Sequence, residues 1–376
     1  MSGLYIHIPY CKQACHYCNF HFSTVQKHKP ALLEAMTKEI AMKSFQESTP
    51  LASVYFGGGT PSVCTPSELS MLLENVRKKH DLLPNAEITL EANPDDLTPS
   101  FIEDLIAMGF NRLSVGVQSF HDRELKMMNR AHNTQQAKDA LSLVADSFSN
   151  WSLDLMFGMP QSNAQSWEQN LEEAMCFDPP HLSAYALTVE PRTALEKYID
   201  KGLVTPCSEN EVVSQFEQLV RYTKSLGYEN YEVNSFSKPG MYSVNNTAYW
   251  TGKPYIGIGP SAHSFEGVRR AWNVSNNAQY IRSLNENSLP ETEEFLSLID
   301  RFNECIMTGL RTQWGVAIDD IQHTFGERFK DHLIQEIQPH ISAHNLKVEN
   351  NVIYTTPRGR FLADGIAASL FLVNLT

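Results

Sequence analysis

The sequence has no excess of basic residues, no long apolar run and no basic leader. Lysine and arginine number 30 against 43 aspartates and glutamates, which gives a formal net charge of −13. An acidic surface repels phosphate backbones, so we expect no general nucleic-acid binding. The chain lacks the run of about 18 apolar residues that predicts a transmembrane segment, and residues 1–5 do not begin a secretory signal. The expected location is the cytoplasm.

Cysteine is scarce and unevenly placed. The seven cysteines are an odd number, and three of them, Cys11, Cys15 and Cys18, fall close together near the start of the chain. A disulfide framework would use an even set spread along the sequence. The clustered trio therefore predicts metal binding in a reducing compartment. We interpret the scattered cysteines as buried thiols.

Six β-like runs alternate with helical patterns over the first half of the chain. The runs are Leu4–Ile8, Ser53–Phe56, Glu87–Ala92, Arg112–Val117, Ser152–Phe157 and Leu182–Val189. Between them lie helical patterns over 30–44, 134–147 and 165–176, and a capping box formed by Thr65 and Glu68. No Gly-x-Gly-x-x-Gly motif follows the first run, which disfavours a Rossmann sheet. The pattern predicts an α/β fold, with a partial (β/α)6 barrel of parallel strands.

The composition changes after about residue 205, and we predict three parts. These are a core barrel over 1–235, a connecting segment over 236–289, and a small helical, winged-helix-like domain over 290–376. In a parallel barrel, chemistry collects at the carboxyl ends of the strands. The cysteine loop, the glycines after the second run, Glu91 and Gln118 all follow such runs. One shared site is therefore expected.

The clustered cysteines have the spacing C-x3-C-x2-C. Three thiolates in one loop can hold three irons of a [4Fe–4S] cluster and leave the fourth iron for a non-protein ligand. Structural zinc usually takes four protein ligands, and His16 or His21 could supply the fourth. Spacing alone favours the open-iron cluster and leaves zinc as an alternative.

The cysteine loop and its surroundings resemble the radical S-adenosylmethionine (SAM) superfamily. Within it, the lead-in YIHIPYC at 5–11 is similar to that of the oxygen-independent coproporphyrinogen III oxidase group. The likeness extends through GGGTPS at 57–62, EANP at 91–94, GVQSF at 116–120 and GIGPSAH at 257–263. The true oxidases carry a further cysteine two residues after the third, where this chain has Phe20. A phenylalanine there resembles the HemW-type haem-chaperone branch.

The resemblance implies a [4Fe–4S] cluster on the three cysteines, with SAM bound to the fourth iron. The SAM-binding residues it implies are Tyr5, Tyr17, Gly58, Gly59, Thr60, Glu91, Gln118, Arg130 and Asp154. Glycines let the backbone approach the methionyl amino and carboxylate groups closely. Arg130 could hold a carboxylate, and Asp154 could accept from a ribose hydroxyl. Without the resemblance, the glycines could form a plain strand–helix turn, and Tyr5 could be a core aromatic.

Residues 245–250, NNTAYW, resemble the HNxxYW motif that is associated with haem binding in the haem-chaperone branch. Here Asn245 replaces the histidine, and an amide is a poor iron ligand compared with imidazole. The haem-binding candidates are Asn245, Asn246, Tyr249, Trp250 and His263, with His263 as an alternative iron ligand. Read alone, Tyr249 and Trp250 could equally be core aromatics.

Together these features predict a [4Fe–4S]- and SAM-binding chaperone that carries haem as its cargo. By family analogy, its clients are haemoproteins, membrane-bound ones among them. No catalytic residue is assigned. The first alternative is radical SAM decarboxylation of coproporphyrinogen III, and the second is a zinc-stabilised protein without radical chemistry.

Overall fold

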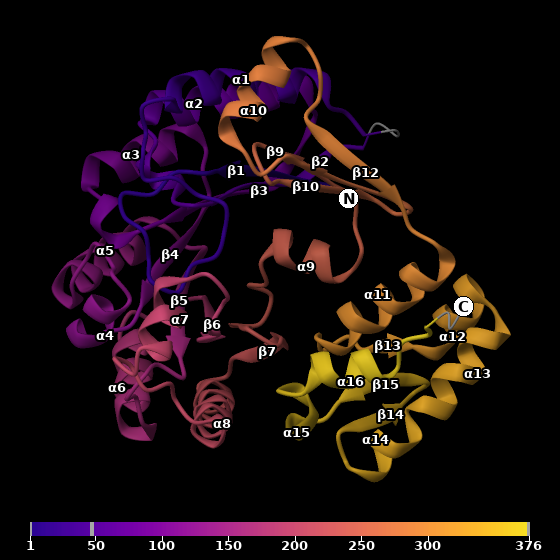
Figure 1. Cartoon of the computed structure of the whole chain (residues 1–376). Helices are drawn as coiled ribbons and strands as arrows, with labels where there is room; N and C mark the ends of the chain where they lie inside the picture. Colours follow the sequence, from indigo (N-terminus) through magenta and orange to yellow (C-terminus); the bar gives the residue numbers. More distant parts are fainter. Residues whose placement is uncertain (1, 46–48, 374–376) are drawn as a thin grey trace.

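The computed structural model describes residues 2–45 and 49–373, and its sheet contains six parallel strands that follow one another in chain order. They are β1 (Ser2–Ile8), β2 (Leu51–Gly58), β3 (Leu82–Ala92), β4 (Arg112–Gln118), β5 (Trp151–Phe157) and β6 (His181–Ala186). The helices of this half are α1 (Lys29–Met42), α2 (Pro66–Lys79), α3 (Pro99–Met108), α4 (Asp122–Met127), α5 (Thr134–Ser147), α6 (Ala164–Met175), α7 (Ala194–Asp200) and α8 (Glu209–Ser225). Figure 1 shows the strands as an arc with α1, α2, α3 and α5 on its outer side. The predicted partial barrel is confirmed.

The sheet continues beyond the six parallel strands at both ends. Its order is β12-β11-β10-β9-β1-β2-β3-β4-β5-β6-β8-β7, so it stays open, with β12 and β7 at the edges. The added elements are β7 (Glu229–Glu232), β8 (Ser235–Ser237), α9 (Val244–Trp250), β9 (Tyr255–Ile258), β10 (His263–Glu266), β11 (Arg269–Asn273), α10 (Asn277–Asn285) and β12 (Glu291–Phe295). The sequence did not predict β9–β11, and the helical pattern expected from about residue 290 is wrong over β12.

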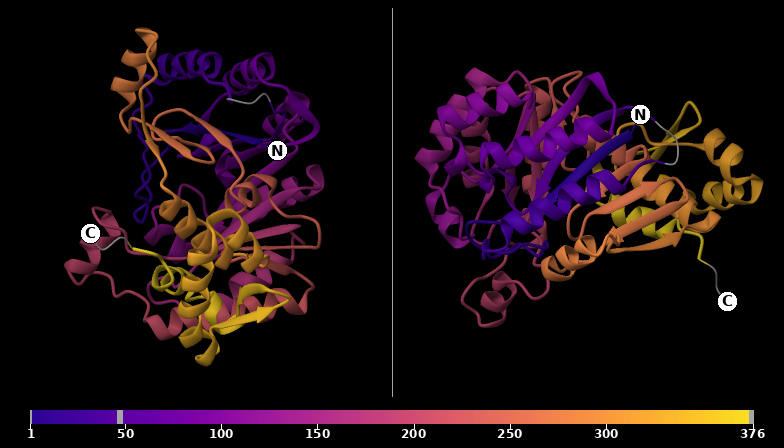
Figure 2. Two further views of the ribbon diagram at one scale, coloured as in Figure 1. Left: turned by 90° about the vertical axis from the view of Figure 1, so that its right-hand side faces the viewer. Right: turned by 90° about the horizontal axis from the view of Figure 1, so that it is seen from above.

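The last third of the chain has a hydrophobic core of its own. Its elements are α11 (Leu298–Leu310), β13 (Val316–Ala317), α12 (Ile318–Phe325), α13 (Glu327–Glu336), α14 (Gln338–Ser342), β14 (Leu346–Glu349), β15 (Val352–Thr355), α15 (Pro357–Arg360) and α16 (Ala363–Ser369). Strands β14 and β15 form an antiparallel hairpin, and two short helices, α15 and α16, follow it. Seen from above, these elements lie to one side of the barrel (Figure 2). The three domain boundaries stay predictions.

The barrel strands alternate apolar and polar side chains, and this alternation gives the sheet a polar inner face. Val54 and Phe56 of β2 pack into the core under the helices. Tyr55, between them, instead donates a hydrogen bond to Glu91 on the neighbouring strand. Strand side chains alternate between the two faces, so the polar set shares one face. Parallel strands covered on both faces are normally apolar throughout, so the polar inner face indicates a ligand site.

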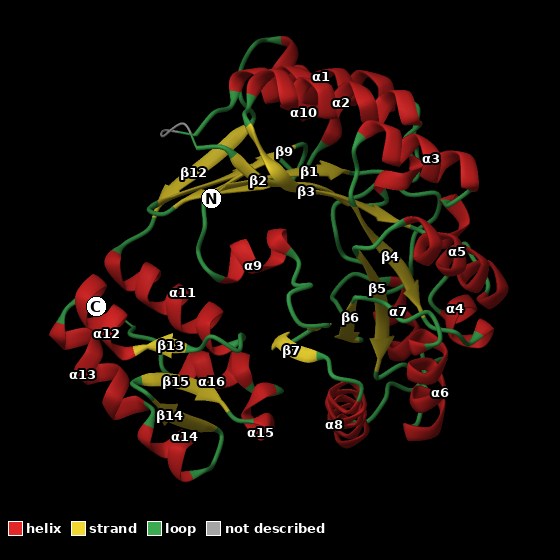
Figure 3. Ribbon diagram, turned by 180° about the vertical axis from the view of Figure 1, so that it is seen from behind, coloured by secondary structure: helices red, strands yellow, loops and turns green. Residues whose placement is uncertain are grey.

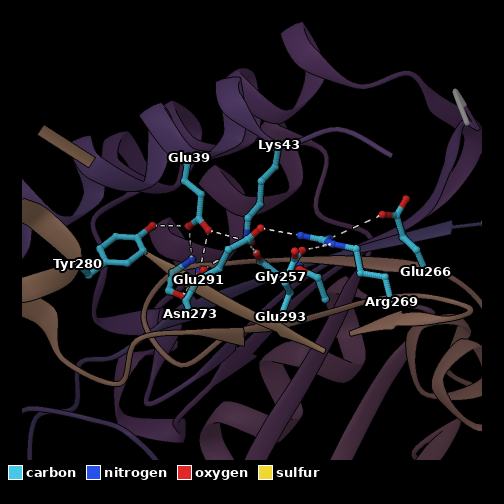
Figure 4. Close-up of polar contacts among 11 residues, drawn as sticks. Glu39, Lys43, Gly257, Glu266, Arg269, Asn273, Tyr280, Glu291 and Glu293 are labelled. Atoms are coloured by element: carbon cyan, nitrogen blue, oxygen red, sulfur yellow. Dashed lines mark hydrogen bonds and ion pairs between the residues drawn. The ribbon is translucent and has the colours of Figure 1, made fainter. Parts of the chain in front are cut away.

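A buried polar network ties α1 to the strands beside β1 (Figure 4). The carboxylate of Glu39, which is fully buried, accepts from Gly259 N at 2.7 Å, from Asn273 Nδ2 at 2.6 Å and from the hydroxyl of Tyr280. It also pairs with Lys43 Nζ at 2.8 Å. The network fixes the turn between β9 and β10, which leads to the inner face. Over the described ranges, no helix combines the length and the apolar character needed to span a membrane.

Candidate functional site

The three clustered cysteines lie in the loop between β1 and α1, at the carboxyl end of the barrel. Backbone hydrogen bonds hold this loop in place. Cys11 N donates to Ser23 O at 3.1 Å, and His16 N donates to Met128 O at 3.0 Å. The second bond attaches the loop to the connection after β4. The structure therefore brings the cysteine loop to the strand ends, where the sequence predicted it.

The thiols of this loop have neighbours that suit thiolate ligands. Burial raises the pKa of Cys11 to about 11, and it raises the pKa of Cys18 as well. Two side chains donate hydrogen bonds to sulfur: Thr60 Oγ1 to Cys11 Sγ at 3.5 Å, and Arg130 Nη1 to Cys15 Sγ at 3.4 Å. Such donors stabilise the negative charge that a metal-bound thiolate carries. The chemistry of the loop therefore fits a metal–sulfur group.

The histidines considered as zinc ligands are engaged elsewhere. His16 Nδ1 lies 2.7 Å from Met127 O, and His21 Nε2 lies 2.8 Å from Asn277 Oδ1. Among the residues that the structure describes, no three His, Cys, Asp or Glu side chains are grouped so as to hold one metal ion. Three separate thiols with no fourth protein ligand instead fit a cluster that is bound at its corners.

The glycine turn after β2 packs directly against the cysteine loop. Gly58 has φ +113°, and a Cβ at Gly59 would meet Tyr10 O at 2.7 Å. The backbone N–H groups of the turn are already used. Gly58 N donates to Glu91 Oε2, Gly59 N to Ile8 O and Thr60 N to Tyr10 O. The turn therefore offers a ligand no free backbone amide at Gly58, Gly59 or Thr60.

Glu91 lies at the end of β3 on the polar inner face, beside Tyr5. Its carboxylate accepts from Tyr55 OH at 2.8 Å and from Gly58 N at 3.1 Å. Burial raises the pKa of Glu91 to about 7, and the nearby Asp154 carboxylate adds to this effect. The ring of Tyr5 stacks on that of Tyr55, with centroids 6.0 Å apart. Glu91 can therefore hold or release a proton near neutral pH.

Arg130 lies between the cysteine loop and the end of β4. Besides Cys15, its guanidinium contacts Tyr17 OH at 3.4 Å and Gly116 O at 2.6 Å, and its Nε is buried with no partner. A Cβ at Gly116 would meet Gln118 Nε2 at 3.0 Å, and Gln118 has φ +71°. Arg130, Tyr17 and Gln118 are thus brought together, and the buried Nε points to a missing acceptor.

Asp154 is held within the barrel by serines on its own and a neighbouring strand. Its carboxylate accepts from Ser114 Oγ at 3.1 Å and from Ser152 Oγ at 3.2 Å. Burial raises its pKa. Asp154 lies in register with Gly116, on the inner face. Its position agrees with a binding role, but part of its acceptor capacity is already used.

The NNTAYW segment forms α9, which lies on the concave side of the sheet (Figure 3). Asn245 is buried there, and its backbone N–H donates to Glu87 Oε1 at 3.2 Å. Ser53 Oγ lies 3.4 Å from Asn245 Oδ1. Tyr249, Trp250 and His263 line one large cleft, whereas the side chain of Asn245 hydrogen-bonds to Tyr249 and neither Asn245 nor Asn246 belongs to the cleft lining. Asn245, which stands at the position of the motif's histidine, thus attaches α9 to β2 and β3.

The cleft has a volume of about 1290 Å³ and lies between the barrel and the C-terminal elements. Tyr5, Gly58 and Glu91 line it on the barrel side, and Arg301 and Trp314 line it from the C-terminal side. Three of the proposed SAM residues therefore line the same cavity as three of the proposed haem residues. The C-terminal wall of the cleft was not predicted from the sequence. Helix α11 shows only the amphipathic pattern of a surface helix, and the cleft forms by tertiary packing.

Comparison with protein families agrees with the geometry. Residues 5–174 match the Radical SAM superfamily, and residues 296–362 match the HemN C-terminal domain. The fold, the cysteine loop and these matches define a protein of the radical SAM class. This class implies a [4Fe–4S] cluster and SAM.

Individual relatives of known name narrow the assignment from the radical SAM class to one family within it. A Bacillus subtilis (strain 168) protein named Heme chaperone HemW is 30% identical over 376 residues, which cover 97% of this chain and 98% of that protein. An Escherichia coli (strain K12) protein of the same name is 36% identical and covers 69% of each chain. The solved structure of Escherichia coli HemN, a coproporphyrinogen III oxidase, shares the fold at 22% identity, with a TM-score of 0.86 and coverage of 98% and 90%. The chain belongs to the HemW family.

Proposed function

We propose that this chain is a haem chaperone of the cytoplasm, which binds a [4Fe–4S] cluster and SAM, takes up haem and delivers it to haemoproteins, membrane-bound clients among them. The observation that carries this proposal is the cleft between the barrel and α11. Ligand sites commonly lie in such clefts between parts of a chain. The names of the curated relatives support the choice of haem.

The walls of the cleft suit a flat apolar ring that carries two carboxylates. Tyr249 and Tyr255 pack edge to face with centroids 4.5 Å apart, and Phe265 follows at 6.1 Å from Tyr255. Arg301 lies over the ring of Phe325 at 6.0 Å, and the described residues give it no ion pair. Its guanidinium is therefore available for a propionate. Aromatic walls and a free guanidinium match the chemistry of haem.

His263 is the proposed iron ligand. Its ring stacks on that of Trp272, with centroids 6.2 Å apart, and lines the cleft. Partial burial and the Arg270 guanidinium lower the pKa of His263, which favours the neutral imidazole that ligates iron. The other cleft histidines are engaged, since His7 Nε2 lies 2.9 Å from His21 O and the ring of His21 contacts Asn277. His263 would thus supply the imidazole that is missing from the motif, in which Asn245 stands at the position of the histidine.

The cluster and SAM are proposed to lie at the barrel end of the same cavity. Cys11, Cys15 and Cys18 would ligate three irons, and SAM would extend over the inner face beside Glu91, Gln118 and Asp154. When bound together, the cluster and SAM supply one-electron reductive cleavage to a 5′-deoxyadenosyl radical. The buried Nε of Arg130 suits the SAM carboxylate. Tyr5, Tyr17 and the turn of Gly58, Gly59 and Thr60 would complete the pocket.

Haem titration of the anaerobically reconstituted protein tests the proposal. We expect a stoichiometric complex with a shifted Soret band and little release of 5′-deoxyadenosine. His263→Ala should change the band and weaken binding about tenfold, and Arg301→Ala should weaken binding without changing the ligand field. His28→Ala, an exposed histidine before α1, serves as the matched control. A wild-type protein that binds no haem would remove the chaperone assignment.

Coproporphyrinogen III decarboxylation is the second candidate, because the fold is shared with HemN. The exposed Phe20, where the oxidases carry a further cysteine, weighs against it. Incubation of the reconstituted protein with coproporphyrinogen III, SAM and a reductant distinguishes the two. Product together with stoichiometric 5′-deoxyadenosine would establish the oxidase and contradict a function limited to haem transfer.

A further inference from the structure

A chain of hydrogen bonds joins two of the cysteine thiols, and Asn93 lies at its centre. Arg130 Nη1 donates to Cys15 Sγ at 3.4 Å, and its Nη2 donates to Asn93 Oδ1 at 2.6 Å. Asn93 Nδ2 donates to Thr60 Oγ1 at 3.4 Å. Thr60 Oγ1 donates onward to Cys11 Sγ at 3.5 Å. The single amide of Asn93 thus orients the donors that reach both sulfurs.

Asn93 is itself held in place. It follows β3 directly, at the start of a 3₁₀ turn (Pro94–Asp96). Its backbone N donates to Ser62 Oγ at 3.2 Å, and Ser62 Oγ donates to Asp96 Oδ2 at 2.5 Å. A second contact fixes the guanidinium, since Arg130 Nη2 also donates to Gly116 O at 2.6 Å. The contacts of Asn93 and Arg130 with the surrounding fold therefore hold the donors to sulfur in place.

We propose that Asn93 is a positioning residue that raises the reduction potential of the cluster by holding Arg130 and Thr60 as hydrogen-bond donors to two of its thiolate ligands. The proposal rests on the cluster of the proposed function. The couple is the one-electron exchange between the 2+ and 1+ states, with dithionite as the electron donor. Hydrogen bonds to cluster sulfurs and a nearby positive charge stabilise the more negative, reduced state. A higher potential makes the cluster a weaker reductant of SAM.

The test is an anaerobic redox titration of the full-length reconstituted protein without SAM, followed by electron paramagnetic resonance of the reduced cluster. Omitting SAM separates the contact of Arg130 with sulfur from its proposed contact with SAM. We expect Asn93→Ala to lower the midpoint potential by the ~59 mV that corresponds to a tenfold shift of a one-electron equilibrium. Asn129→Gly is the control, because Asn129 Nδ2 donates to Ala14 O in the cysteine loop, not to a sulfur, and glycine tolerates the positive φ of this position.

A double mutant separates the hydrogen-bond chain from unrelated effects. If Asn93 acts through Arg130, Asn93→Ala combined with Arg130→Met should shift the potential by less than the sum of the single shifts. If Asn93→Ala does not assemble a cluster, Thr60→Val and Arg130→Lys are titrated instead, and each should lower the potential. Full iron content with an unchanged midpoint in these variants would overturn the inference alone. A wild-type protein without a cluster would overturn the proposed function as well.

Discussion

Glu91 combines a buried carboxylate with the two hydrogen bonds that it accepts from Tyr55 and Gly58. These bonds favour the charged form, yet burial opposes it more strongly and sets the direction of the shift. Asp154 lies in the same barrel interior and is shifted the same way. Two carboxylates kept out of water reduce folding stability where both are ionised. They are consistent with a site that a cationic ligand completes.

We predict that Glu91→Gln changes the free energy of unfolding of the cluster-free protein more favourably at pH 8 than at pH 5. The folded-state pKa of Glu91, about 7, is above its ordinary value of 4.5. The stability contribution of the protonated group is thus fully present below pH 4.5 and is lost as the pH rises through 7. At 1.36 kcal/mol per pKa unit, the loss is about 3 kcal/mol. Urea unfolding of both proteins at the two pH values measures it, and an equal effect of the substitution at pH 5 and pH 8 would contradict the pKa shift.

At the scale of single residues, prediction from the sequence succeeded where the spacing of side chains along the chain is enough to indicate their shared chemistry. The C-x3-C-x2-C trio lies in one loop beside the glycine turn, as its spacing and position after the first strand indicated. It failed where partners come from distant strands. That Gly58 N is taken by Glu91, and that Asn245 is buried against Ser53 and Glu87, follows from strand register, which the sequence does not reveal.

At the scale of elements, helices with strong end signals were predicted well, and charged strands were missed. The capping box of Thr65 and Glu68 is present at the start of α2, and α5 has the predicted bounds. By contrast, β11 and β12 are rich in charge and are joined by pairs such as Arg269–Glu293 at 2.7 Å. Cross-strand charge pairs stabilise a sheet without apolar alternation, so the pattern that identifies strands is absent.

Thr65→Ala should destabilise the protein by about 1 kcal/mol, because it removes the side-chain acceptor for Glu68 N at the start of α2. The substitution leaves the cleft untouched. The free energy of unfolding from urea titration measures the change. Ser70→Ala, which removes a side-chain hydrogen bond to Glu74 in the middle of the same helix, is the control, and an equal loss in both variants would show that the cap contributes nothing specific.

Glu39→Ala should cost about 3 kcal/mol, because it removes a fully buried carboxylate that accepts from Asn273 and Tyr280 and is one of the two carboxylates paired with Lys43. The same loss should loosen the turn before β10, since Gly259 N donates to Glu39. Glu34→Ala, which breaks an exposed pair with Lys38 on the same helix, should cost less than about 0.5 kcal/mol. Similar costs for the two variants would contradict a stabilising role of the buried network.

For the whole molecule, the barrel and the C-terminal elements meet at the edge strand β7 and around α9. Val233 N donates to Arg311 O at 3.0 Å, and the Arg311 guanidinium lies over the ring of Trp250 at 4.9 Å. The sequence indicated a barrel, a connecting segment and a helical domain, but not the cavity between the barrel and the helical domain, because no local pattern encodes how two surfaces pack. Three of the proposed SAM residues and three of the proposed haem residues line that cavity.

A shared cavity predicts that haem slows the release of SAM. Haem bound against Trp250 and Arg301 would cover the side of the cleft opposite Glu91 and Gly58, so SAM would have to leave past it. We expect labelled SAM to dissociate several-fold more slowly from the reconstituted protein when haem is bound. Arg301→Ala, which weakens haem binding, should restore fast release at a limiting haem concentration and leave release without haem unchanged. If haem binds stoichiometrically and SAM still dissociates at its original rate, then the two ligands do not share the path, and haem must bind outside this cleft.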